Sequence, residues 1–182
     1  MKLFNKLATI VLGSSLLLTT PVSASERAEH QELIDALESV GVTVVINDPR
    51  ACDGDNHHGW YSPSHAVLAV CQDNSSSISS REVQWTPNDY DTLRHEAHHA
   101  VQDCLVGGLG DSESGLLFND FEQLKSFVSS SLSEKEIEDI IGTYRNNGTS
   151  DEDILRELEA FAVARVIPAW KTAEAVTTLC RG

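Results

Sequence analysis

The chain has 182 residues, of which 41% are hydrophobic and only 6% are aromatic, as expected for one globular domain with a modest core. Its 28 Asp and Glu residues outnumber its 13 Lys and Arg residues, which gives a formal net charge of −15. Such an acidic surface argues against nucleic acid and anionic membranes as partners.

The first 24 residues have the pattern of a secretory signal peptide. Lys2 and Lys6 provide the basic start, residues 7–20 form an uncharged apolar run, and Val22-Ser23-Ala24 is a small-residue cleavage site. The run is short and interrupted by Ser and Thr, which disfavours the alternative of an uncleaved membrane anchor. We therefore expect a secreted or periplasmic protein, cleaved after Ala24, whose residues 25–182 form a single domain with no membrane contact.

The four cysteines all lie after the expected cleavage site, at Cys52, Cys71, Cys104 and Cys180. An even number in an oxidising compartment predicts disulfides, and the absence of a CxxC pair argues against a cysteine zinc site. Three pairings are possible. We favour Cys52–Cys71, which closes a short β-rich loop, and Cys104–Cys180, which staples the C-terminal segment to the centre of the chain.

A helix and a small sheet are expected in the first part of the mature chain. Residues 26–40 place apolar side chains on one side of a helix, and Gly41 ends it. The β-branched run over residues 42–46 predicts a strand. Residues 59–61 and 66–71 predict two further strands that form a hairpin around a Ser-Pro-Ser turn.

The segment from Thr86 to Leu105, TPNDYDTLRHEAHHAVQDCL, predicts the central helix of the domain. Thr86 suits the N-cap, Pro87 suits the first helical position, and Asp89 completes a pattern like a capping box. An apolar stripe then recurs every three or four residues, formed by Tyr90, Leu93, Ala97, Val101 and Leu105.

The sequence after the central helix predicts helices over residues 116–129, 133–145 and 151–167, and a last helical stretch that ends near Cys180. Capping patterns begin the second and third of these helices, with Ser133 and Glu136 in one and Ser150 and Asp153 in the other. The expected fold class is thus α+β: a small sheet with an edge hairpin packed on the central helix, followed by a helical C-terminal half.

His95, Glu96 and His99 form an H-E-x-x-H pattern within the central helix. On a helix the two histidines lie one turn apart on one face and can share a metal ion, and Glu96 can reach a water bound to that metal. His98 points in another direction, so we expect it to be exposed or to neighbour the ligands.

A catalytic zinc site needs a third protein ligand. The metzincin pattern would place Gly and His at positions that hold Gln102 and Leu105, which excludes that class. The later helix offers Glu157 and Glu159, which are about 200° apart around a helix and cannot both face one metal. We favour Glu159, because it lies in the apolar stripe and a buried acid must be paired or metal-bound; Glu157 is the alternative.

These residues resemble the HExxH zincin metallopeptidases of gluzincin type, in which a glutamate on a later helix completes the site. The E-A-F-A run from Glu159 to Ala162 is similar to the E-G-F-A of aminopeptidase-type gluzincins, which also favours Glu159. The resemblance implies a minimal zincin-like fold and an edge strand, here Ala66 to Cys71, that binds substrate in extended form.

A second resemblance covers the middle third of the chain. The stretch from Gly59 through VLAVCQDN to DTLRHEAHHAVQDC is similar to small peptidases that process a mitochondrial ATP-synthase subunit. Those peptidases show a comparable C-Q-N, H-E-x-x-H-A and D-x-C layout. The H-E-A-H-H core and the lack of a specificity motif are departures from it.

The resemblance implies an exported zinc-dependent peptidase with one zinc ion per chain. A metal-activated water would hydrolyse a peptide or protein substrate with Glu96 as general base, and we expect a monomeric endopeptidase. Tyr144, Tyr61, His57 and His58 are candidates for stabilising the oxyanion. The alternatives are a secreted zinc-binding interaction protein without catalysis, which would not require Glu96, and a disulfide-stabilised structural protein in which the motif is accidental.

Overall fold

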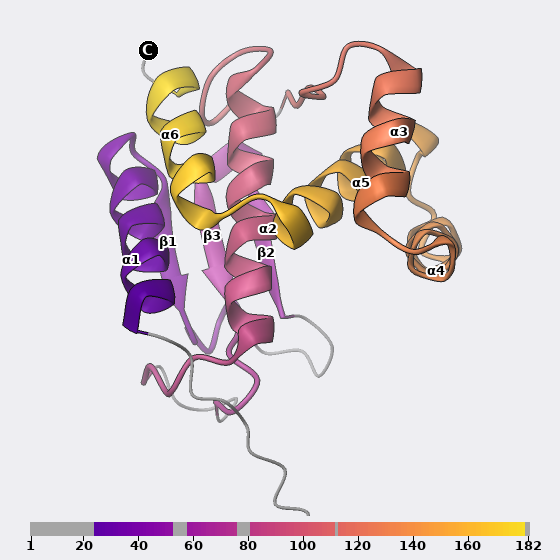
Figure 1. The fold of residues 1–182 in the computed structure, drawn as a ribbon. Coiled ribbons are helices and arrows are strands. Elements are labelled where there is room, and N and C mark those ends of the chain that lie inside the picture. Colours follow the sequence, from indigo (N-terminus) through magenta and orange to yellow (C-terminus); the bar gives the residue numbers. More distant parts are fainter. Residues whose placement is uncertain (1–23, 53–57, 76–80, 112, 181–182) are drawn as a thin grey trace, which may run out of the picture.

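The computed structural model describes residues 24–52, 58–75, 81–111 and 113–180 (Figure 1). The expected signal peptide lies outside this part of the chain, apart from Ala24, the first residue of helix α1. Within the described ranges, no helix combines the length and the apolar character that a membrane crossing requires.

The fold is α+β, as expected, with a small mixed sheet of three strands in the order β1-β3-β2. Strand β1 (Thr43–Ile46) pairs in parallel with β3 (Val67–Val70), and β2 (Gly59–Ser62) pairs with β3 in antiparallel orientation. A short 3-10 helix, η1 (Pro63–His65), joins the two strands of the hairpin.

The expectation that Ala66 to Cys71 forms the edge strand is wrong, because β3 occupies the centre of the sheet and the two edge strands are β1 and β2. The sequence of β3 is an uninterrupted apolar run, and three of its four residues are buried. Such a run is typical of a strand covered on both faces and paired on both sides.

Helix α2 (Pro87–Cys104) packs against β2 and β3, with α1 (Ala24–Ser39) and α6 (Ala169–Leu179) beside it (Figure 1). The other three helices, α3 (Phe121–Ser131), α4 (Glu134–Asn146) and α5 (Asp151–Val166), extend away from the sheet. Helix α5 connects this group to α2.

Two hydrophobic cores result from this arrangement. The larger core lies between the sheet and helices α1, α2 and α6, with Leu68 and Val70 of the central strand fully buried in it. The smaller core joins α3, α4 and α5, and its buried members are Leu124, Val128, Leu132, Ile154, Leu158 and Ala162. The two cores meet where α5 crosses α2.

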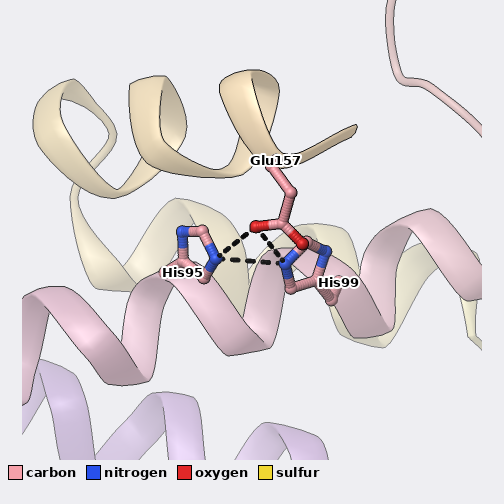
Figure 2. Close-up of side chains that lie close together, drawn as sticks. All are labelled: His95, His99 and Glu157. Carbon is pink, nitrogen blue, oxygen red and sulfur yellow. Dashed lines mark hydrogen bonds and ion pairs between the residues drawn. The ribbon is translucent and has the colours of Figure 1, made fainter. Parts of the chain in front are cut away.

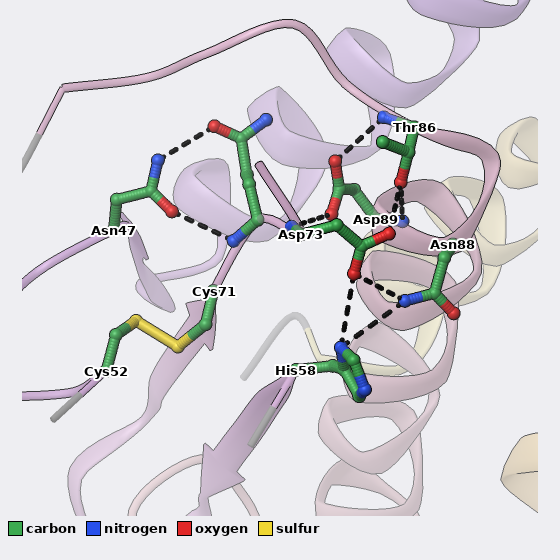
Figure 3. A network of polar contacts seen from close by, with 9 residues as sticks. Asn47, Cys52, His58, Cys71, Asp73, Thr86, Asn88 and Asp89 are labelled. Carbon is green, nitrogen blue, oxygen red and sulfur yellow. Dashed lines mark hydrogen bonds and ion pairs between the residues drawn. A yellow bond between two sulfur atoms is a disulfide. The ribbon is translucent and has the colours of Figure 1, made fainter. Parts of the chain in front are cut away.

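The start of α2 has the predicted capping box and is also tied to the end of β3. The Thr86 hydroxyl accepts from the Asp89 N–H, and the Asp89 carboxylate accepts from the Thr86 N–H at 2.7 Å. The same carboxylate accepts from the backbone N–H of Asp73, whose own side chain accepts from the Thr86 hydroxyl at 2.8 Å (Figure 3). These bonds fix the position of α2 relative to the sheet.

The predicted helix over residues 116–129 begins later than expected, at Phe121. The backbone N–H groups of Leu117 and Phe118 donate instead to the side chain of Glu159, at 3.2 Å each. Asp120 then caps α3 by accepting from the Gln123 N–H. A tertiary contact has displaced the local helical pattern.

Both expected disulfides are present. Cys52–Cys71 connects the segment after β1 to the end of β3, and Cys104–Cys180 joins the C-terminal ends of α2 and α6. Each bridge is expected to stabilise the fold by about 2–4 kcal/mol, chiefly by restricting the unfolded chain.

A buried histidine links α1 to α2. His30 stacks on Tyr90, with ring centroids 4.1 Å apart, and its Nδ1 donates to the Glu26 carbonyl at 2.7 Å. Its Nε2 accepts from Arg94 at 3.0 Å, and Arg94 also donates to the Ala164 carbonyl of α5. Burial lowers the pKa of His30 to about 4 against the opposing effect of the hydrogen bond to the Glu26 carbonyl, and the charge of Arg94 adds a smaller lowering.

His30 makes stability depend on pH. Because its folded-state pKa is depressed, the unfolded chain binds the proton first, so stability is lost as the pH falls from about 6.5 towards 4. The shift corresponds to a loss on the order of 3 kcal/mol. We expect His30→Gln to flatten this dependence, measured by urea unfolding with a chelator present at pH 7 and pH 4.5. An equal loss of unfolding free energy between pH 7 and pH 4.5 in the wild type and in His30→Gln would contradict this role of His30.

Candidate metal centre

Two histidines of α2 and one glutamate of α5 converge on a common point (Figure 2). The Nε2 atoms of His95 and His99 lie 3.1 Å apart. Glu157 Oε2 lies 3.2 Å from the first and 3.5 Å from the second. The group can hold a metal ion.

The distances fit a tetrahedral ion. Ligand atoms bound at about 2.0–2.1 Å in tetrahedral geometry are separated by about 3.3 Å, and the observed separations of 3.1, 3.2 and 3.5 Å scatter around this value. Among the described residues, no hydrogen bond of normal geometry satisfies the buried Glu157 Oε2. A buried carboxylate oxygen left in this state is expected where a cation completes the site.

The electrostatic environment also favours a positive charge. Burial alone would lower the pKa of His99, but the hydrogen bond and charge of Glu157, together with the charge of Glu96, raise it to about 9. Burial would raise the pKa of Glu157, yet its contacts with His95 and His99 hold it well below the usual range. The site thus stabilises an added cation.

Glu159, the preferred third ligand in the sequence, does not join this group. It is fully buried, as expected, but its carboxylate accepts from His98 at 3.0 Å and from Gln102 at 2.8 Å. The N–H groups of residues 117 and 118 provide two more bonds. Hydrogen bonds rather than a metal offset the cost of burying this acid, and the alternative, Glu157, faces the histidines.

The surroundings of the two glutamates explain why the pattern misled. Glu157 shares its side of α5 with Phe161, one turn later, whose ring packs on His95 at 4.3 Å between centroids. This mixed polar and aromatic face is the one that meets the histidines. His98 is only 3% exposed, so the expectation that it is exposed is wrong. It lies beside the site instead, hydrogen-bonded to Glu159.

Glu96 faces the cleft between α2 and the edge strand. It is 7% exposed. Burial raises its pKa, and the charge of Glu157 adds to the rise against the opposing effect of the two histidines. The nearby backbone N–H of Tyr61 has a small lowering effect on the same pKa. Its carboxylate is therefore a stronger base than an exposed glutamate would be.

Two cavities, of about 320 and 340 Å³, adjoin the site. Both are lined by Gly59, His95, Glu96 and Tyr144. One extends along the start of α2 towards the end of α5, and the other lies along the end of α2 and the start of α5. The group of His95, His99 and Glu157, called the metal group below, therefore lies where the two cavities adjoin.

The edge strand β2 carries backbone groups that do not pair with β3. The Cys71 N–H donates to the His58 carbonyl at 2.7 Å, so His58 and Trp60 direct their backbone groups to β3. By alternation, Gly59 and Tyr61 direct theirs away from it.

Gly59 allows α2 to approach this strand closely. A Cβ at this position would lie 2.6 Å from Thr92 Cγ2, 2.7 Å from the Ala69 carbonyl oxygen and 3.3 Å from Glu96 Cγ. No side chain fits there without moving the strand or the helix. The absence of a side chain thus sets the distance between Glu96 and the edge strand.

Among the oxyanion candidates in the described residues, Tyr144 of α4 is the one that interacts with Glu157. It lines both cavities, within hydrogen-bonding reach of Glu157, and burial and that carboxylate raise its pKa. The Tyr61 hydroxyl donates instead to Asp103 at 2.6 Å. His58 pairs with Asp73 beside one cavity (Figure 3), and His57 lies outside the described residues.

Comparison of the chain with protein-family models, with curated proteins and with solved structures finds no match. The site must therefore be interpreted from its own residues.

The geometry predicts that Glu157 of α5 is the third metal ligand. Glu157→Ala removes a ligand and should weaken binding of Zn²⁺ by at least about 100-fold, since the two remaining histidines make an incomplete site. The measurement is a chelator competition titration at pH 7.5, with Glu138→Ala, an exposed acid on α4, as the matched control. Wild-type affinity in Glu157→Ala would show that Glu157 is not a ligand.

Proposed function

We propose that this protein is an exported zinc-dependent peptidase of zincin type that cleaves internal bonds of peptide or protein substrates. The observation that carries the proposal is the position of Glu96, which lines both cavities beside the three-residue metal group. A metal site that served only for stability would need no buried carboxylate at this point.

The donor set supports zinc in particular. Two imidazole nitrogens and one carboxylate oxygen form a set used by catalytic zinc sites, with one position left for water or substrate. When bound, zinc would supply a Lewis acid that polarises the scissile carbonyl and activates a water molecule. His95, His99 and Glu157 would hold it.

Glu96 would act as the general base. Its buried carboxylate, with its raised pKa, is suited to accept a proton from water and to return it to the leaving amine. The Tyr144 hydroxyl, kept protonated by its raised pKa, would donate a hydrogen bond to the developing oxyanion.

Two features support a peptide substrate. The backbone groups of Gly59 and the carbonyl of Tyr61 point away from β3, and they can form hydrogen bonds with an extended chain laid along the edge of the sheet. The cavities that adjoin the metal group could take substrate residues on both sides of the scissile bond, which favours an internal bond. The two disulfides are consistent with an oxidising compartment outside the cytosol.

The decisive experiment is Glu96→Gln. The change removes the base but none of the three ligands, so we expect zinc to be retained stoichiometrically while hydrolysis falls by about 10²–10⁴-fold. Hydrolysis is measured on an unfolded protein substrate such as reduced, alkylated casein. A wild-type protein that binds no zinc, even when zinc is supplied, would overturn the proposal.

Two other outcomes have separate meanings. A wild-type protein that binds zinc but hydrolyses no unfolded substrate would favour the non-catalytic interaction protein instead. Full activity in Glu96→Gln would remove Glu96 from the mechanism.

Gly59→Ala tests the role of the edge strand. Since the added methyl must displace β2 from α2 near Glu96, we expect kcat/KM to fall by about 10²-fold, the usual cost of a misplacement near 1 Å. Zinc affinity should remain close to wild type because no ligand changes. Gly142→Ala, where a Cβ meets no atom within 4 Å, is the control. Unchanged kcat/KM would show that the close approach is not needed.

A further inference from the structure

One buried polar network next to the metal group has no part in the proposed reaction. Gln102 and Glu159 are both fully buried, one on α2 and one on α5, and they are joined by a 2.8 Å hydrogen bond. Gln102 also lies 2.8 Å from Nδ1 of His99. The network therefore begins at a fully buried carboxylate and ends on a metal ligand.

The hydrogen-bond partners fix the orientation of the Gln102 amide. Its nitrogen lies between the Glu159 carboxylate and the Arg156 carbonyl oxygen, at 2.8 and 3.1 Å. Both of these partners can only accept, so the NH₂ group must face them. The amide oxygen is then the atom that faces His99.

The oriented amide in turn determines the tautomer of His99. An amide oxygen only accepts, so Nδ1 of His99 must carry the proton and donate it to Gln102. In the neutral ring, which is the form that binds a metal, Nε2 then carries the lone pair. The proton arrangement that metal binding requires thus follows from the position of the Glu159 carboxylate.

The other histidine ligand has no equivalent support. Nδ1 of His95 is buried and has no hydrogen-bond partner among the described residues. Its ring is positioned by packing against Phe161. Of the two histidines, His99 is therefore the one whose ring is oriented by a hydrogen bond.

We propose that Glu159 and Gln102 are positioning residues for the metal centre: the buried carboxylate orients the amide, and the amide fixes the metal-binding tautomer of His99. The role rests on the metal centre of the proposed function but not on peptide hydrolysis. It assigns Glu159 a part in metal binding without direct coordination.

The test is Gln102→Met, which keeps the length and approximate volume of the side chain but removes the amide. We expect zinc affinity, measured by chelator competition, to fall by 10–100-fold, the usual effect of losing such a partner. In the zinc-bound protein, the slowly exchanging Nδ1 proton of His99, detected by ¹⁵N-correlated NMR, should disappear. Gln123→Met, at an exposed position of α3, should change neither.

Glu159→Gln is the second variant, in case Gln102→Met does not fold. Its amide cannot accept from all of the donors that face Glu159, so Gln102 loses its fixed orientation and zinc affinity should again fall by 10–100-fold. Wild-type zinc affinity with a protected His99 proton, in either folded variant, would overturn the inference. A wild-type protein that binds no zinc would overturn the metal centre itself. A wild-type protein that binds zinc but hydrolyses no substrate would contradict the proposed function and leave this inference standing.

Discussion

The crossing of α5 over α2 depends on one buried carboxylate. Glu159 is fully excluded from solvent and accepts from two side chains of α2 and from two backbone N–H groups of the segment before α3. Leaving such a group unpaired would cost several kcal/mol, so these four bonds restrict how α5 can rotate and slide. Because Glu157 is two residues away on the same rigid helix, its position over the histidines is set by the same restriction. The metal group is thus a consequence of how the two cores are joined.

The features that could be predicted from the sequence are those whose signals are local. The pair Thr86 and Asp89 begins α2 where expected, since a capping box is contained within four residues. The two disulfides agree with the pairing that was favoured, but the sequence left all three pairings open. The strand order was not accessible, because it depends on which distant segment pairs with each side of β3. The uninterrupted apolar run of β3 nevertheless contained the signal for a central strand.

The choice between the two glutamates shows where pattern reasoning stops. The apolar stripe correctly indicated that Glu159 is buried, but burial has several possible causes. Its partners include Leu117, 42 residues earlier in the chain, in a segment that was expected to be helical. One missed contact therefore produced two errors, the helix start and the third ligand. Gln102, noted in the sequence only as a departure from another class of site, proves to contact His99, a candidate ligand.

The disulfide between Cys104 and Cys180 has a consequence for the durability of the protein. Its two cysteines are 76 residues apart, and the loop that it closes contains Glu157, Tyr144 and the whole smaller core. A single cut of the chain anywhere in this loop would leave both fragments covalently joined. The helices that carry the two halves of the metal group would stay together after such a cut. Chain continuity is therefore not required to keep Glu157 near the histidines.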